Sequence, residues 1–170
     1  QGVKPLRVVV FDFNPDGVVA ATDNYYPCAS LAKYIKTLND NGISTVAYLR
    51  NKTSRHTVLP VLACKDVVMA QDAKIGDVLP PGGNMDAEFA AAYARYAGAD
   101  REAAVTRMFT PNLPIVKGIR DGQSIYVDPA RAEQMKVFVQ KKSDSVKPIG
   151  QTLWSVDEAL MFQLCQVSGL

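Results

Sequence analysis

A serine and a histidine stand two positions apart in the segment Thr53-Ser54-Arg55-His56-Thr57. A serine hydroxyl becomes a nucleophile for acyl transfer when a neighbouring base takes its proton, and histidine is a frequent base of this kind. His56 is the only histidine of the chain, so a Ser-His-Asp triad would have to use it. Ser54 is therefore the candidate nucleophile, with His56 close by.

The same residues also have an ordinary structural interpretation. Serine and threonine are frequent at the start of a helix, where their side chains bind free backbone N–H groups. Residues this close along a helix point in different directions, so on a helix Ser54 and His56 would not face each other. We favour this interpretation, a capping residue beside a polar histidine in a vestigial cleft, over Ser54 as a nucleophile.

Few other residues indicate chemistry. The three cysteines, Cys28, Cys64 and Cys165, are too few and too scattered for a disulfide framework or a C-x-x-C metal site. A single histidine also excludes a multi-histidine metal site. We therefore expect no metal and no cofactor. Cys64 lies in an apolar stretch typical of core packing, and Cys28 follows Tyr-Tyr-Pro near a helix start, where a thiol can be reactive.

The composition is that of one globular domain over residues 1–170. Hydrophobic residues make up 48% and charged residues 21%, and the net charge is +2. This charge balance gives no strong positive electrostatic field, so we expect no nucleic acid as a partner. No apolar run is long enough to span a bilayer, so we expect a soluble fragment. The chain begins at Gln1 rather than Met, which we interpret as a piece of a larger protein.

The elements that must position these residues indicate an α/β fold. Apolar runs at 6–13 and 44–49 predict strands, the first of them buried, and the spacing of Leu31, Ile35 and Leu38 predicts a helix between them. Strand, helix and strand in so few residues form a βαβ unit, whose strands run parallel. The fold class is therefore a mainly parallel sheet built from βαβ units, with helices around it.

The rest of the chain continues this pattern and then changes. We expect a turn at 14–17, a polar break at 50–55, a short buried helix at 57–64 and a strand at 67–70. An Asp121-Gly122 turn within 113–127 predicts a β-hairpin, and Ser155 with Glu158 predicts a capping box. Further helices are predicted at 85–97, 103–108, 130–139 and 155–164, with a polar loop at 141–147.

Four stretches of the chain resemble a known superfamily. They are FDFNPDG at 11–17, STVAYL at 44–49, LACKDVVMAQDAKIG at 62–76 and WSVDEALMFQLCQVSG at 154–169. Together they are similar to the Clp-protease/crotonase superfamily, and within it to membrane-bound serine proteases of the NfeD long-form and signal peptide peptidase A types. The resemblance spans nearly the whole chain, and its most specific stretch is 62–76.

This resemblance implies positions for the catalytic groups. The nucleophilic serine of the family opens a helix after a strand, and that position falls on Arg55, with His56 one residue away. The general-base lysine of the NfeD type falls on Met85. The oxyanion-hole turn, a P-G-G sequence in the family, is Pro15-Asp16-Gly17 here, which places a carboxylate beside a developing oxyanion. We expect Arg55 and Asp16 to pair.

Three functions follow from this comparison. We favour a catalytically degenerate, protease-like domain that acts as a binding or assembly module. The alternative is an active serine endopeptidase that cuts hydrophobic peptide segments through Ser54. A second alternative is a crotonase-like acyl-thioester enzyme. The resemblance also implies a homo-oligomer, a peptide or protein partner, and membrane association, on the extracytoplasmic side, through segments outside this chain.

Overall fold

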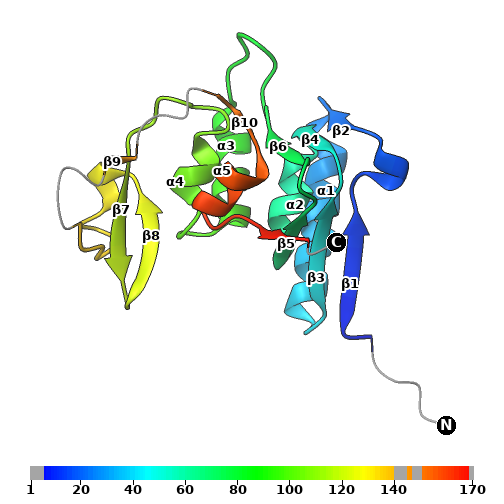
Figure 1. Ribbon diagram of the computed structural model, residues 1–170, viewed down its shortest axis with the longest axis horizontal. Helices are drawn as coiled ribbons and strands as arrows, with labels where there is room; N and C mark the ends of the chain where they lie inside the picture. Colours follow the sequence, from blue (N-terminus) through cyan, green and yellow to red (C-terminus); the bar gives the residue numbers. More distant parts are fainter. Residues whose placement is uncertain (1–5, 140–144, 147–150, 169–170) are drawn as a thin grey trace. The chain divides into compact units, whose positions relative to one another are not determined.

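The computed structural model describes residues 6–139, 145–146 and 151–168 (Figure 1). The chain groups into two compact units. Unit 1 comprises Gln1–Gly76 with Trp154–Leu170, and unit 2 comprises Asp77–Leu153. The mixture of helices and largely parallel strands confirms the predicted α/β class. A single domain over residues 1–170 stays a prediction.

Unit 1 begins with strands that come in pairs along the chain. They are β1 (Val8–Asp12) and β2 (Ala20–Thr22), β3 (Ser44–Leu49) and β4 (Lys52–Arg55), and β5 (Asp66–Met69) and β6 (Lys74–Gly76). The first strands of the pairs form one parallel sheet, in the order β1-β3-β5-β11, which ends at β11 (Gln166–Val167). The second strands form another sheet, in the order β10-β6-β4-β2, in which β2, β4 and β6 are parallel.

Unit 1 has helices after β2, after β4 and after β10. They are α1 (Tyr25–Asp40), α2 (Val58–Ala63) and α5 (Val156–Met161). One stripe of α1, with Cys28, Ala32 and Ile35, is buried, and α1 contacts both α2 and β3. The helix ends at Asn41-Gly42, where Gly42 has a φ of 79°, because glycine adopts this left-handed conformation without strain.

The prediction of a buried first strand is wrong. β1 is an edge strand, and its Val8 and Val10 side chains are 52% and 60% exposed. Its neighbour β3 alternates between half-buried and buried residues instead. An apolar run predicts burial on both faces only for strands in the middle of a covered parallel sheet. At the edge of this sheet, the same residues leave one face open.

A strand also forms where the sequence indicated a polar break. β4 pairs with β2 and β6, and its Thr53 and Ser54 are buried despite their hydroxyl groups. Polar side chains can lie in the interior when hydrogen bonds compensate for the lost water. The predicted buried helix that follows is confirmed as α2, whose six residues are all buried. Pro60 is tolerated because the N–H groups of a first helical turn have no partner within the helix.

The C-terminal part of unit 1 follows the predicted capping box. The Ser155 side chain accepts a bond from the Glu158 backbone N–H, and the Glu158 carboxylate accepts one from the Ser155 N–H. Just before it, β10 (Leu153–Trp154) carries Trp154, which is fully buried. Its ring lies 4.8 Å from that of Phe162, measured between centroids. Trp154 thus packs against the end of the last helix.

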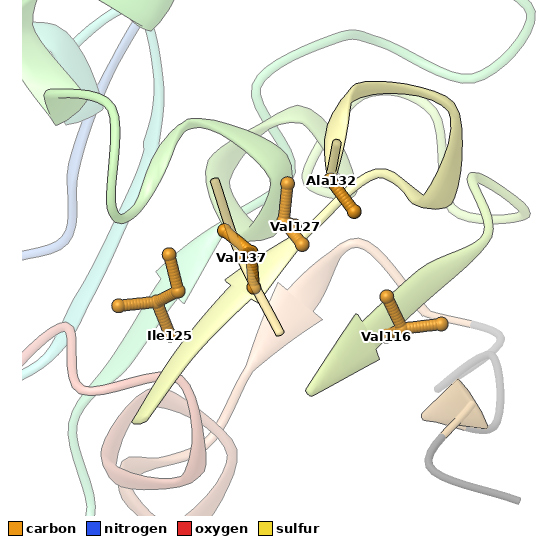
Figure 2. Packing of buried hydrophobic residues seen from close by; sticks show 5 residues of the cluster. All are labelled: Val116, Ile125, Val127, Ala132 and Val137. Atoms are coloured by element: carbon orange, nitrogen blue, oxygen red, sulfur yellow. The ribbon is translucent and has the colours of Figure 1, made fainter. Parts of the chain in front are cut away.

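Unit 2 combines helices with a small antiparallel sheet. Its elements are α3 (Ala87–Ala97), α4 (Glu102–Thr106), β7 (Ile115–Arg120), β8 (Gln123–Val127), the 3-10 helix η2 (Pro129–Arg131) and β9 (Ser145–Val146). β7 lies between β8 and β9. The hairpin turn is confirmed, with φ values of 52° at Asp121 and 78° at Gly122. The hydrophobic core beside this sheet contains Val116, Ile125, Val127, Ala132 and Val137 (Figure 2).

The helix predicted at 130–139 is wrong, since η2 ends at Arg131 and turns follow it. Phe138 instead exchanges both backbone hydrogen bonds with Ile119 of β7, at 3.0 and 2.9 Å. Gly118 makes this possible, because a Cβ there would lie 2.2 Å from Val137 Cγ1. The prediction of a loop at 141–147 is wrong at Ser145–Val146, which form β9. Residues 141–144 and 147 lie outside the described residues.

Candidate functional site

The turn after β1 is organised by a buried asparagine. Asn14 is fully buried, and its side-chain amide joins the turn to the segment that leads into β4. Its Nδ2 donates to two carbonyls, and its Oδ1 accepts from two backbone N–H groups and one hydroxyl. The partners are Val18 O at 2.9 Å, Lys52 O at 3.2 Å, Arg50 N at 3.1 Å, Asn51 N at 3.2 Å and Thr53 Oγ1 at 3.3 Å. One side chain thus holds residues 14–18 against 50–53.

Two further contacts reinforce this junction. The Asn51 side chain donates to the Gly17 carbonyl at 2.6 Å. Arg50 pairs with Asp12 at the end of β1, and the guanidinium holds the pKa of that carboxyl below its usual value. The sequence indicated Asn14 only as a turn residue. An asparagine side chain carries a donor and an acceptor but no charge, so it can bond several backbone groups in a buried position. The Asn14-Pro15 pair is the only signal in the sequence for this wider role.

The turn that the resemblance assigns to an oxyanion hole is closed on itself. Pro15–Gly17 form the 3-10 helix η1, with Asp16 at a φ of 57° and Gly17 at 73°. The Gly17 N–H donates to the Asn14 carbonyl at 2.9 Å, and the Val18 N–H donates to the Pro15 carbonyl at 3.1 Å. An oxyanion hole needs such N–H groups directed at the reacting oxygen. In this conformation the Gly17 N–H is used within the turn.

Arg55 occupies a strained turn between a strand and a helix. It ends β4, three residues before α2 begins, and its φ is 58°. An arginine rarely adopts this left-handed backbone, which costs about 1–3 kcal/mol. Its Nε lies 3.3 Å from Asp23 Oδ1. The structure thus gives Arg55 an ion pair with Asp23, which adjoins β2, while a pairing with Asp16 stays a prediction.

Ser54 lies within β4 rather than at a helix start. It pairs in register with Ala21 of β2 and Gly76 of β6 and is 3% exposed. The interpretation of Ser54 as a helix cap is therefore wrong. The position before α2 belongs to Thr57, whose side chain makes no capping bond. Because Ser54 is buried, its hydroxyl is not accessible to a substrate in this conformation.

His56 follows the strained turn and is buried. Its N–H donates to the Thr22 carbonyl at 3.0 Å, and its ring packs edge-on against Tyr25, with 5.4 Å between centroids. Burial lowers the pKa of the imidazole, while the nearby Asp23 carboxylate partly opposes that shift. The ring is therefore neutral at pH 7. A neutral imidazole can accept a proton, but Ser54 lies within the strand and His56 beyond its end, with the strained residue between them.

The candidate lysine position belongs to unit 2. Met85 lies in the loop before α3, which begins at Ala87 rather than at residue 85. Asp86 caps that helix, because its side chain accepts the Glu88 N–H at 2.8 Å. The structure therefore places Ser54, Arg55, His56, Asp16 and Gly17 in unit 1 and Met85 in unit 2.

The cysteines pack in the interior. Cys28, Cys64 and Cys165 are all buried and free. Burial raises the pKa of all three thiols, to about 12 for Cys64 and about 11 for Cys165. The shift at Cys28 is opposite to that of an activated thiol. Among the described residues, no group of three or more His, Cys, Asp or Glu side chains could hold a metal ion.

Comparisons of the chain with protein-family models, curated proteins and solved structures give no match. The geometry of this site is therefore the guide to function. Two adjoining segments, 14–25 and 50–56, bring together a closed turn, a buried asparagine, an ion pair and a neutral histidine. These groups are bonded within the protein, and Ser54, inside β4, is separated from His56 by the strained residue Arg55.

Proposed function

We propose that this chain is a protease-like domain of the Clp-protease/crotonase superfamily, of the NfeD type, that has lost peptidase chemistry and acts as a binding or assembly module. The observation that carries the proposal is Arg55 at a strained strand-to-helix turn. Serine hydrolases of the α/β type present their nucleophile on such a turn. Here the position holds an ion-paired arginine, which offers no nucleophile.

The order of elements supports the family assignment. The resemblance expects a turn after one strand and a nucleophile where another strand leads into a helix. η1 follows β1, and Arg55 connects β4 to α2. The parallel pairing of β1 with β3 and of β2 with β4 brings these two segments alongside each other. The hydrogen bonds of Asn14 between them support a preserved framework rather than a chance likeness.

The closed turn supports the loss of catalysis independently. A working oxyanion hole would have to break the bond from Gly17 N–H to Asn14 O and would still place the Asp16 carboxylate beside it. Active peptidase chemistry through Ser54 would require a rearrangement that exposes a hydroxyl now buried within β4. An acyl-thioester enzyme would depend on the same closed turn, so the module remains the function that the geometry supports best.

Two exposed apolar residues follow the closed turn and give the module a place to bind. Val18 and Val19 are 62% and 50% exposed, directly after Gly17. An extended segment with exposed apolar side chains on both sides can contact a partner through either side. We propose that they bind a hydrophobic peptide segment of a partner, which is the class of substrate that the resembled proteases cut.

A peptide assay tests binding and turnover together. A fluorescent decapeptide of leucine, valine and alanine is incubated with the chain, with anisotropy reporting binding and mass spectrometry reporting cleavage. We expect binding without cleavage, and an affinity loss of about fivefold or more in Val18→Lys/Val19→Lys. Met161→Lys, on α5 and 40% exposed, is the matched control. Cleavage that disappears in Ser54→Ala would contradict the proposal.

Assembly and membrane association are further parts of the proposal. Self-association is supported by the resemblance, and sedimentation velocity over a range of concentrations tests it; a single monomeric species throughout would contradict it. Within the described parts of the chain, none of the helices has the length and apolar character needed to cross a bilayer. The resemblance supports association through segments outside this sequence, which flotation of the whole protein with vesicles tests. Saturable coenzyme A binding would favour the acyl-thioester alternative instead.

A further inference from the structure

Unit 2 contains a cavity that the proposed function does not use. Its volume is about 140 Å³. Ala103 and Val127 are buried in its wall, together with the partly buried Leu113 and Met135. Val127 also belongs to the hydrophobic core of Figure 2, so this wall is held by close packing, whereas Met135 can adapt its shape. A dry cavity of about 150 Å³ accepts a benzene molecule, so about six non-hydrogen atoms fit here.

Three charged side chains line the same cavity. They are Glu102, Asp128 and Arg131, two carboxylates against one guanidinium. Arg131 pairs with Glu102, and the two side chains are 46% and 25% exposed, so this end of the cavity reaches solvent. Asp128 caps η2 by accepting the Ala130 N–H at Oδ1, at 2.9 Å. The carboxylate has further acceptor capacity, because each of its oxygens carries two lone pairs.

We propose that this cavity binds a primary alkylammonium ion of about five carbons. The alkyl chain would fill the apolar part, and the ammonium group would donate to Asp128 beside the Glu102–Arg131 pair. The excess negative charge selects a cation over an anion. Arg131 interacts with both Glu102 and Asp128, so the two carboxylates share one guanidinium. A neutral chain of equal length would bury the same apolar area without adding a second cation, so it would bind more weakly.

Pentylamine is the probe that tests this site. At pH 7 it carries the charge of a lysine side chain, while 1-pentanol and pentanoate are its neutral and anionic counterparts. Titrations of the full chain, followed by amide NMR shifts, give the three affinities. We expect pentylamine to bind about fivefold or more tightly than 1-pentanol, and pentanoate most weakly. Equal affinities for the amine and the alcohol, or no shifts around α4 and η2 at tens of millimolar, would overturn the proposal.

Two variants separate charge from shape. Asp128→Asn keeps a side-chain oxygen that can cap η2, so it should fold and lose the preference for amine over alcohol. Asp121→Asn removes the same charge from the exposed hairpin turn and should leave the preference unchanged. Ala103→Leu fills the cavity and should remove binding of both ligands. An amine preference that survives Asp128→Asn would overturn the assignment, whether or not Ala103→Leu folds.

Discussion

Replacing Asn14 with alanine should destabilise unit 1 strongly. The buried amide makes five hydrogen bonds, four of which join the turn after β1 to residues 50–53. A typical hydrogen bond contributes about 0.5–1.5 kcal/mol net, and a buried group left without a partner costs about 1–3 kcal/mol. Asn51 and Lys52 are only half-buried, so water can replace some of the lost bonds. We therefore expect a loss of about 3 kcal/mol in the free energy of unfolding.

Urea unfolding followed by Trp154 fluorescence measures this loss. Trp154 is the only tryptophan, and it is buried in unit 1, so its emission reports on the unit that contains Asn14. The matched control is Asn41→Ala, which removes an exposed asparagine that donates to the Thr37 carbonyl at 2.8 Å. The control should lose less than about 1 kcal/mol. If Asn14→Ala loses no more than the control, the asparagine does not hold the junction.

Three further predictions follow from the packing. Gly118→Ala should destabilise unit 2 by about 1–3 kcal/mol, because the added Cβ would lie 2.2 Å from Val137 Cγ1. Thermal unfolding followed by circular dichroism measures this loss. An unchanged unfolding transition would refute the contact. Burial lowers the pKa of His56, so the unfolded chain binds its proton first and stability should fall as pH drops from about 7 to 5; His56→Gln should flatten this slope. Cys64 and Cys165, with pKa values of about 12 and 11, should resist iodoacetamide at about pH 8 until urea unfolds the chain, and rapid alkylation of the folded protein would contradict their burial.

Local patterns predicted the elements that depend on local residues. The βαβ unit at 6–49, the hairpin turn at Asp121-Gly122 and the capping box at Ser155 each follow from a few neighbouring residues. Elements that depend on distant partners were predicted less well. β4 has no apolar alternation and exists because β2 and β6 flank it. Phe138 pairs with β7 because Gly118 leaves space, which helical periodicity at 130–139 does not reveal.

The candidate site shows the same division. The family resemblance placed Arg55, Asp16 and Gly17 at the positions where chemistry was expected, and all three lie in the adjoining turns of unit 1. The sequence alone could not reveal that the Gly17 N–H is bonded within its own turn, or that Arg55 has a left-handed backbone. Both features depend on how the turn meets the neighbouring strand, so they required the three-dimensional structure.

The proposed function requires that the candidate site has no activated serine. Intact mass spectrometry of the chain after incubation with a fluorophosphonate probe tests it most directly, because the probe bonds covalently to activated serine hydroxyls. We predict an unmodified mass for the native chain and for Ser54→Ala alike, since Ser54 is buried within β4. A single stoichiometric adduct on the native chain that is absent from Ser54→Ala would contradict the claim.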